Sequence, residues 1–390
     1  MARKLITGNH AAGHALALAG EANRGGRGCT GGAYPITPQT EIIEYLLNFP
    51  FTKGRIVPVE SEHSAMAVCI GASLAGARAF TASSSNGLAY MTENVFCAGY
   101  YRLPIVMVAV NRTLGPPWNI WSDQGDALAL RDAPWIQFFC DTHQEVLDTV
   151  LVAFRVGEDR RVLLPVLVSM DAFILSHTTS ETDLPEQHAV DRFLPTCDIP
   201  HCLDQQHPVT VGGLIWPRET ASQRWEIDQA FRNVEPVFEQ ARREFADVFG
   251  RSVGGPISAI GTEDAEVVLV ASGAIACTAA DVVHERRRAG ERIGLIKVKL
   301  FRPFLGTAIR RALGKATKVG VLDRNYAPGV GGVFWHDLRA ELQGAPGVLV
   351  QNYLTGLCGM DVTPAVIHEI CDDLLARGRM EAPIWKGLES

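Results

Sequence analysis

The sequence predicts an α/β protein in which parallel strands alternate with helices. Residues 104–110 form an unbroken apolar run, which fits a strand that is covered on both faces. Strand-like and helix-like patterns alternate from the start of the chain to about residue 184, and they alternate again from residue 265. We therefore predict a first domain over residues 1–185, a connector over residues 186–262 and a smaller α/β domain over residues 263–390.

The composition is that of a globular protein with a large core, because 47% of the 390 residues are hydrophobic and 20% are charged. The formal net charge of -7 gives no basic surface for nucleic acid. No apolar run approaches the roughly 18 residues of a membrane span, and the N-terminus does not read as a signal peptide. We expect a cytoplasmic protein with no nucleic-acid or membrane partner. The 9 cysteines are scattered and form no C-x-x-C pair, so we expect no iron–sulfur cluster in this chain.

The first elements lead to a rigid loop. Residues 8–20 read as an Ala-rich helix, on which we expect His10 and His14 to pack rather than bind a metal, since no third ligand is in view. The Gly-rich segment 25–32 lacks the P-loop pattern. Pro35 and Pro38 then restrict the backbone around Thr37, and Thr40 is placed to cap the next helix. Such a segment either presents polar groups to a small anion or is simply a proline-punctuated loop.

The next segments place polar residues after strands. A short strand at residues 56–59 is followed by Glu60-Ser61-Glu62 and by a helix over residues 64–77 whose many small residues allow close packing. Strands are predicted at residues 79–83 and 163–168, and the strand at 104–110 ends at Arg112. Ligands of parallel sheets bind beyond the carboxyl ends of the strands, so segments around Thr37, Glu62, residues 83–85 and Arg112 are expected to converge.

The connector and the second domain carry weaker signals. Residues 225–249 show an amphipathic helical pattern that Pro236 kinks or restarts and that Gly250 ends, and we expect the connector to pack across domains or subunits. Strands are predicted at residues 266–271, 293–300 and 317–322, with a helix over 275–288. The arginines at 286–288 read as a solvated helix end rather than a phosphate site, and the glycines at 329–332 lack a full G-x-G-x-x-G.

Several motifs in the right order resemble one known family. The chain resembles the alpha subunit of 2-oxoacid:ferredoxin oxidoreductases, and the pyruvate:ferredoxin oxidoreductases in particular. The matching stretches are spread over nearly the whole chain: GNHAA (8–12), YPITPQTE (34–41), ESEHSA (60–65), NRTL (111–114), RD (131–132) with WIQ (135–137), LFRPF (300–304), and GL (356–357) with DVT (361–363).

The resemblance implies a fold and a shared cofactor. It implies a parallel-sheet domain that binds the pyrimidine ring of thiamine diphosphate, and a smaller transketolase-C-terminal-like α/β domain. The module that holds the diphosphate carries a G-D-G motif in this family, whereas QGDA at residues 124–127 lacks the second glycine. The diphosphate site, Mg²⁺ and the iron–sulfur clusters are therefore expected on partner subunits (beta, gamma or delta), with ferredoxin as electron carrier and coenzyme A and a 2-oxoacid as substrates.

The resemblance also implies three site residues. Glu62 would bind the ring nitrogen N1′ and favour the imino tautomer that takes the proton from thiazolium C2, which is general acid–base work for a partly desolvated carboxyl. Arg112 would bind the carboxylate of the 2-oxoacid through forked donors, and Thr37 would hydrogen-bond its keto oxygen or carboxylate. The motif favours Glu62 over Glu60; without it, both would read as exposed strand-end carboxylates. No metal ligand is assigned to this chain.

The implied reaction is the oxidative decarboxylation of pyruvate with coenzyme A to acetyl-CoA, CO₂ and reduced ferredoxin, which fixes CO₂ when run backward. The same type of complex acting on a branched 2-oxoacid, 2-oxoglutarate or oxalate is an alternative, as is a non-catalytic scaffold subunit. We expect the loop at residues 118–126 to line the substrate pocket. Trp118 and Trp121 favour a small acid there, while Gln124, where the family often has a histidine, leaves the substrate open.

Overall fold

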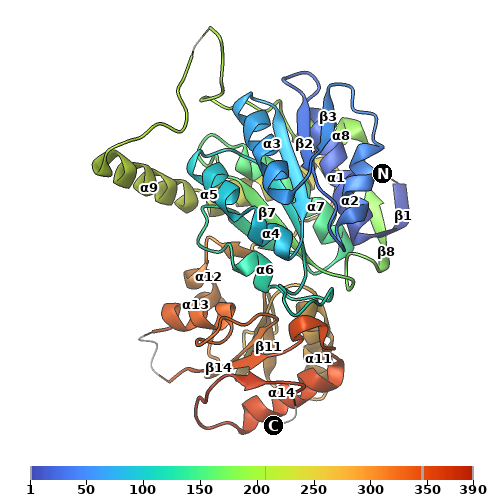
Figure 1. The fold of residues 1–390 in the computed structure, drawn as a ribbon. Helices are drawn as coiled ribbons and strands as arrows, with labels where there is room; N and C mark the ends of the chain where they lie inside the picture. Colours follow the sequence, from blue (N-terminus) through green and yellow to red (C-terminus); the bar gives the residue numbers. More distant parts are fainter. Residues whose placement is uncertain (1, 207, 344–346, 389–390) are drawn as a thin grey trace.

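A computed structural model describes residues 2–206, 208–343 and 347–388, which form two α/β units, one above the other in Figure 1. The N-terminus lies in the upper unit and the C-terminus in the lower one. Within the described residues, no helix is both long and apolar enough to cross a membrane.

The first unit is built on a sheet of seven strands in the order β12-β6-β7-β5-β4-β2-β3. The strands from the first half of the chain pair in parallel, as the alternating pattern predicts, whereas β12 comes from the second half and pairs antiparallel with β6. The strands are β2 (Cys29–Ala33), β3 (Gly54–Pro58), β4 (Arg78–Ser83), β5 (Val106–Asn111), β6 (Ile136–Phe139), β7 (Val166–Asp171) and β12 (Leu300–Arg302).

Helices cover both faces of this sheet, which explains the unbroken apolar run in β5. Val106, Val108 and Val110 point into a core shared with α1 and α7, while Met107 and Ala109 point into a core shared with α3 and α5. The helices of this unit are α1 (Gly8–Ala22), α2 (Thr40–Leu47), α3 (Glu62–Leu74), α4 (Asn86–Tyr90), α5 (Thr92–Tyr100), α6 (Gly125–Leu128) and α7 (His143–Gly157).

The expectation that every strand up to residue 184 joins the parallel sheet is wrong. β8 (Thr179–Leu184) pairs instead with β1 (Ala2–Thr7) in a separate antiparallel two-stranded sheet. Most residues of both strands are exposed or partly exposed. Neither strand therefore has the continuous apolar run of a central strand, and the sequence gives little sign of their pairing.

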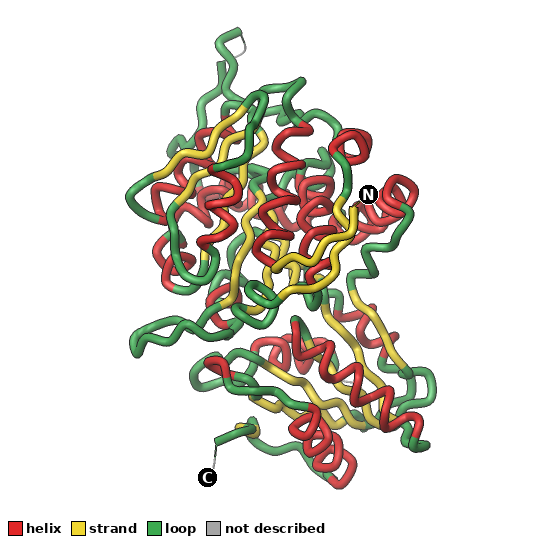
Figure 2. Tube along the Cα trace, turned by 90° about the vertical axis from the view of Figure 1, so that its right-hand side faces the viewer, coloured by secondary structure: helices red, strands yellow, loops and turns green. Residues whose placement is uncertain are grey.

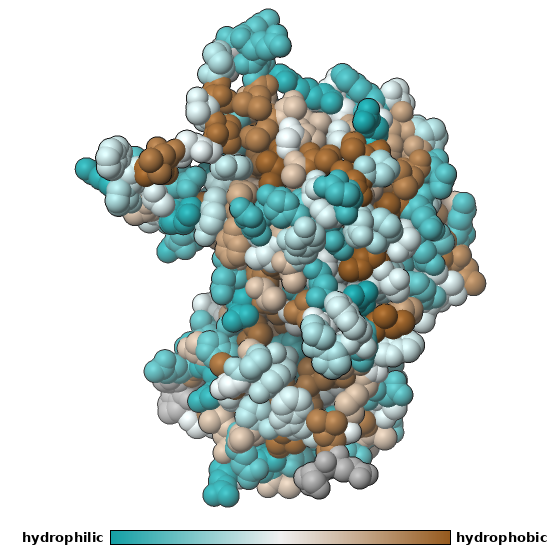
Figure 3. Space-filling model, viewed as in Figure 1, coloured by the Kyte–Doolittle hydropathy of each residue, from teal (hydrophilic) through white to brown (hydrophobic). Residues whose placement is uncertain are grey.

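The segment between the units contains α8 (Gln187–Phe193), α9 (Pro217–Arg232) and α10 (Val234–Phe249). The amphipathic pattern at 225–249 is thus two helices, because α9 ends at Arg232 and Pro236 lies in the first turn of α10, where proline is tolerated. Gly250 ends α10 at φ 68°, as predicted. α9 projects from the body (Figure 1), and Figure 3 shows a patch of hydrophobic atoms, in brown, on this arm. Large apolar side chains are exposed on α9 and on the segment before it: Leu214, Trp216 and Trp225.

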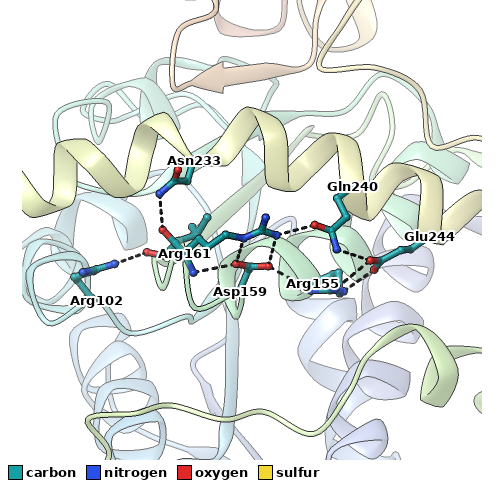
Figure 4. Close-up of polar contacts among 8 residues, drawn as sticks. Arg102, Arg155, Asp159, Arg161, Asn233, Gln240 and Glu244 are labelled. Atoms are coloured by element: carbon teal, nitrogen blue, oxygen red, sulfur yellow. Dashed lines mark hydrogen bonds and ion pairs between the residues drawn. The ribbon is translucent and has the colours of Figure 1, made fainter.

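α10 packs on the first unit through both apolar and polar contacts. Its buried face, which includes Phe238 and Phe245, belongs to the same core as α1 and α7. Figure 4 shows the polar side of the contact: Arg155 of α7 pairs with Glu244 (2.9 Å), and the Arg161 guanidinium donates to the Gln240 side-chain oxygen (2.8 Å). The packing of this helix therefore ties the connector to the first unit.

The second unit has a sheet of six strands in the order β15-β14-β13-β10-β11-β9, in which only β9 is antiparallel to its neighbour among the described pairs. The strands are β9 (Ile257–Ile260), β10 (Val267–Ala271), β11 (Ile293–Val298), β13 (Lys318–Asp323), β14 (Leu349–Leu354) and β15 (Ile384–Trp385). The helices are α11 (Ala274–Arg288), α12 (Gly306–Ala312), α13 (Val333–Glu341), the 3-10 turn η1 (Leu357–Gly359) and α14 (Pro364–Ala376).

One of the hydrophobic clusters contains residues of both units. Phe139 of the first sheet packs against Phe301 of β12 and Phe334 of α13, with ring centroids 6.0 and 5.6 Å apart. Figure 2 shows the strands of the two sheets, in yellow, one above the other. Because β12 adds to the first sheet, the second unit is anchored to the edge of that sheet by backbone hydrogen bonds as well as by apolar contact.

Candidate active site

The segments that carry the predicted site residues meet at one edge of the first sheet. The strands β3, β2, β4 and β5 are parallel neighbours, so their carboxyl ends lie side by side. The guanidinium of Arg112, just after β5, donates a hydrogen bond to the backbone carbonyl of Thr37, after β2, with Nη1 and O 2.5 Å apart. The structure thus brings together segments that lie far apart in the sequence.

Glu62 lies in the first turn of α3, where the helix dipole favours a carboxylate. Ser61 caps the helix by accepting a hydrogen bond from the Ser64 N–H. The Glu62 side chain is buried, and none of the described residues hydrogen-bonds its carboxylate. Glu60, in contrast, is exposed and accepts a hydrogen bond from the Ser64 hydroxyl, so of the two acids only Glu62 points into the site.

The backbone of Gly87 lies close to the Glu62 side chain. A Cβ on Gly87 would lie 2.7 Å from Glu62 Oε1 and 2.4 Å from the Ser83 hydroxyl, so only glycine fits between them. Gly87 lies on α4, directly after the turn at Ser85. Ser85 has φ 49° and ψ -124°, a strained conformation for a residue other than glycine. The turn that follows β4 therefore shapes the wall behind the Glu62 carboxylate.

Arg112 is buried, and its Nε has no hydrogen-bond partner among the described residues. Burial lowers its pKa from the ordinary value, while the charges of Asp126 and Glu62 act in the opposite direction. A buried guanidinium with an unused donor is suited to bind a small carboxylate.

The Thr37 loop is held by amide side chains. The Asn9 side chain of α1 donates to the Pro38 carbonyl (2.7 Å), and the Gln39 side chain donates to the Tyr34 carbonyl (2.8 Å). Thr37 itself is exposed, and its known contact to Arg112 is through the backbone. The expectation that Thr40 caps α2 is wrong, because Thr40 is the first helical residue and Gln39 takes the N-cap position without a side-chain bond.

Asp126 joins these loops. In the sequence, Asp126 stands out only as part of an incomplete G-D-G motif. Its side chain is buried, and four N–H donors converge on its carboxylate, from the backbone of Ser85, Arg112 and Ala127 and from the Asn111 amide, at 2.7–2.9 Å. Burial raises the pKa of Asp126 to about 7, and these hydrogen bonds oppose the rise. A strand-end polar pair, Asn111-Arg112, was the only sequence signal for this arrangement.

The loop at residues 118–126 turns largely toward the second unit. The buried Gln124 side chain donates to the Ser272 carbonyl (3.4 Å), and Trp121 packs on Phe173 at 4.9 Å between ring centroids. The Gln124 side chain thus bonds the second unit, and the expectation that this loop lines the substrate pocket stays a prediction. A cavity of about 780 Å³ lies between this loop and the second unit, but Thr37, Glu62 and Arg112 are not among its lining residues.

Other polar groups that the sequence raised make structural contacts. His14 Nδ1 lies 2.8 Å from the Tyr45 hydroxyl, which fits the packing interpretation. The part of the chain that the structure describes contains no group of three or more His, Cys, Asp or Glu side chains placed to hold a metal ion. Arg286 pairs with Glu291 and Asp372, and Arg287 pairs with Asp264, so these two arginines are held in ion pairs. Arg288 is exposed, as the prediction of a solvated helix end requires.

The polar groups at this edge fit the ring of thiamine diphosphate. Two buried polar groups near Glu62, the Ser83 hydroxyl and Arg112 Nε, have no hydrogen-bond partner among the described residues. Buried polar groups without partners are costly unless a ligand, water or partner satisfies them. One free carboxylate beside two unused polar groups suits a ring nitrogen and an acid substrate.

Comparisons with known proteins identify the related families and subunits. Residues 30–243 match the family described as pyruvate flavodoxin/ferredoxin oxidoreductase, thiamine diphosphate-binding, and residues 265–367 match pyruvate:ferredoxin oxidoreductase core domain II. The chain is 44% identical to pyruvate synthase subunit PorA of Methanothermobacter thermautotrophicus, over 86% of this chain and 88% of that protein. It is 39% identical to ketoisovalerate oxidoreductase subunit VorA of Pyrococcus abyssi, over 95% and 93%.

Solved structures agree on the fold. A 2-oxoglutarate:ferredoxin oxidoreductase from Magnetococcus marinus superposes with a TM-score of 0.73 at 20% identity, covering 95% of this chain and 65% of the other. This chain thus spans about two thirds of that protein. A transketolase from Campylobacter jejuni superposes with a TM-score of 0.54 at 12% identity, covering 86% and 41%. Both likenesses support the predicted pair of α/β domains.

Proposed function

This chain belongs to the family of thiamine diphosphate-dependent pyruvate:ferredoxin oxidoreductases, and we propose that it is the alpha subunit of a complex that oxidatively decarboxylates pyruvate. The net reaction converts pyruvate and coenzyme A to acetyl-CoA and CO₂ and delivers two electrons to ferredoxin. The observation that carries the proposal is the placement of the buried Glu62 and the buried Arg112 at one sheet edge, where Arg112 contacts the Thr37 loop.

Glu62 is the residue that we assign to cofactor activation. Bound thiamine diphosphate supplies a carbanion that attacks the keto carbon of the substrate and stabilises the product of decarboxylation. Glu62 would hold a proton between its carboxylate and the ring nitrogen N1′, which promotes formation of that carbanion. Its position at the start of α3, with the Gly87 backbone behind it, fixes the direction of the carboxylate.

Arg112 and Thr37 are the residues that we assign to the substrate. The guanidinium would bind the carboxylate of the 2-oxoacid through its unused Nε and the neighbouring donor. The Thr37 hydroxyl would hydrogen-bond the keto oxygen or the carboxylate. The bond between Arg112 and the Thr37 carbonyl holds these two residues next to each other.

We propose that this chain supplies one half of the cofactor site and that partner subunits supply the other half. No cluster of acidic side chains able to hold Mg²⁺ occurs within the described ranges, and Asp126 already accepts four hydrogen bonds. A beta subunit would hold the diphosphate and Mg²⁺, and beta, gamma or delta subunits would carry the iron–sulfur clusters. Ferredoxin would accept the electrons from that assembly, and coenzyme A would accept the acetyl group.

A branched 2-oxoacid is the second candidate substrate, since a relative named for ketoisovalerate matches the chain nearly end to end. The loop at residues 118–126 does not separate the two candidates, because the Gln124 side chain bonds Ser272 and Trp121 lies against Gly359, both of the second unit.

The complex should be isolated under anaerobic conditions through a tag on this chain, and its coenzyme A-dependent reduction of a viologen dye should be measured with a panel of 2-oxoacids. We expect the highest kcat/KM with pyruvate. A preference for 2-oxoisovalerate would support the second candidate, and an assembled complex without turnover of any 2-oxoacid would contradict the proposed function and favour a scaffold.

The role of Glu62 has a matched control two residues away. Glu62→Gln should lower kcat by about 10²-fold or more, the range expected for loss of a general acid–base group. Glu60→Gln changes an exposed carboxylate and should leave kcat within about twofold of the wild type, as expected for a surface change. Equal rates in both variants would refute the assignment of Glu62.

A further inference from the structure

One carboxylate connects the two loops that carry the proposed site. Asp126 Oδ2 accepts hydrogen bonds from the backbone N–H of Ser85 (2.8 Å) and of Arg112 (2.9 Å). Asp126 Oδ1 accepts from the Asn111 side-chain amide (2.9 Å) and from the N–H of Ala127 (2.7 Å). A single oxygen therefore fixes the distance between the end of β5 and the turn after β4.

Both of these loops determine where a proposed functional side chain lies. Arg112 extends directly from the backbone N–H that Asp126 binds. Ser85 begins the turn into α4, where Gly87 lies against the Glu62 carboxylate. Ser85 also keeps a strained backbone conformation, which persists only if its surroundings impose it. The Asp126 bond to its N–H and the bond from its hydroxyl to the Thr113 carbonyl (2.5 Å) supply that constraint.

We infer that Asp126 is a positioning residue for the reaction, which sets the placement of Arg112 relative to Glu62 by bonding both supporting loops with one carboxylate. This inference rests on the proposed function of Glu62 and Arg112. Asp126 itself is buried and does not face the open edge, so it acts through the other two residues.

The arrangement requires an ionised carboxylate. All four partners of Asp126 are N–H donors, so a proton on either oxygen would take the place of an accepted bond. The charged group that interacts with Asp126 is the Arg112 guanidinium, which also interacts with the Glu62 carboxylate. Because burial raises the pKa of Asp126 to about 7, part of the population is protonated below that pH.

The test uses the purified complex and a matched control in the second unit. Asp323 is equally buried and also accepts four N–H donors, from Asn325, Asn352 and the backbone of Phe334 and Trp335, but it contacts neither site loop. Asp126→Asn replaces one acceptor by an NH₂ group that faces N–H donors. We expect it to raise KM for the 2-oxoacid at least tenfold. We also expect kcat/KM of the wild type to fall below about pH 7, and this fall to be absent in Asp126→Asn.

Asp323→Asn should leave the KM and the pH profile of the wild type unchanged, even where it lowers thermal stability. If both variants show the same KM and the same acid limb as the wild type, the inference is wrong while the proposed function stands. If the wild-type complex turns over no 2-oxoacid at all, the proposed function is what fails.

A milder variant decides the matter if Asp126→Asn does not assemble. Asn111→Ala removes one donor and keeps the carboxylate, so the ionised form of Asp126 loses a stabilising bond. The acid limb of kcat/KM should then move to higher pH. An acid limb at the wild-type position in this variant would overturn the inference.

Discussion

The carboxyl ends of the two sheets are built alike but are used differently. In each unit a buried aspartate, Asp126 or Asp323, accepts four N–H donors beside a buried arginine, Arg112 or Arg324. Asp126 ties two loops at an open edge. Asp323 instead receives the N–H groups of Phe334 and Trp335 at the start of α13, where it caps a helix.

The edge of the second sheet is closed by the first unit. The Ala274 N–H at the start of α11 donates to Asp171 (2.7 Å), and the Gln124 N–H donates to the Arg324 carbonyl (2.9 Å). A helix N-terminus that would otherwise bind an anion thus holds a carboxylate of the same chain. Similar local chemistry thus surrounds a proposed site in one unit and a joint between the units in the other. Both edges keep buried guanidinium nitrogens without a hydrogen-bond partner among the described residues, on Arg112 and on Arg324, but only Arg324 lies at the joint between the units.

The largest expected effect that tests this contrast comes from the two arginines. Arg112→Lys keeps the charge but loses the forked donors, and we expect kcat/KM for the 2-oxoacid to fall by about 10²-fold, mainly through KM. Arg324→Lys should lower the melting temperature, since Arg324 lies 3.7 Å from the buried Asp171, with KM within about twofold of the wild type. Steady-state kinetics and thermal melts of complexes with either variant test these expectations. A KM change of equal size in both variants would contradict the proposed difference between the two sheet edges.

Two glycines give the next largest effect. A Cβ on Gly87 would meet Glu62 Oε1 at 2.7 Å, and a Cβ on Gly332 would meet Asp323 well inside contact distance. Gly87→Ala should reduce kcat about tenfold or more by displacing the carboxylate, whereas Gly332→Ala should mainly destabilise the protein, by about 1–3 kcal/mol. Activity per assembled complex separates the two, and full activity of Gly87→Ala would argue against close contact at Glu62.

The smallest expected effect is on stability as a function of pH. Burial raises the pKa of Asp126 to about 7 and that of Asp323 to about 6, both above the unfolded value. The unfolded state then loses its proton first, so each group contributes stability that is present below about pH 4 and is lost as pH rises through the folded pKa. The difference in melting temperature between wild type and Asp126→Asn should therefore change up to about pH 7, and that for Asp323→Asn only up to about pH 6. Parallel melting curves between pH 4 and pH 8 would contradict this.

Much of the fold was predictable because local patterns and parallel pairing agree. The apolar run in β5, the small residues of α3 and the stop at Gly250 each have a local physical cause. The segments around Thr37, Glu62 and Arg112 could be placed at one edge since each follows a strand. The domain boundaries at residues 185 and 262 stay a prediction, although α10 packs on the first unit.

Long-range pairings escaped prediction. β1 and β8 lie more than 170 residues apart and are mostly exposed or partly exposed, and β12 joins a sheet made by the other half of the chain. The loop that contains Gln124 follows Arg112 closely, and we therefore predict that it lines the substrate pocket. The Gln124 side chain, however, donates a hydrogen bond to a residue of the second unit. Spacing along the chain does not say toward which neighbour a loop residue turns.

The sequence by itself determined the alternation of strands and helices, the residue types at the strand ends and the absence of a complete diphosphate motif. Only the tertiary structure decided that Glu62 rather than Glu60 is buried, that Asn9 and Gln39 hold the Thr37 loop, and that Asp126 joins two loops. The physical reason is that burial and hydrogen bonding belong to groups of distant residues. Residues that are distant in sequence decide whether a carboxylate is hydrogen-bonded and in which direction its pKa is shifted.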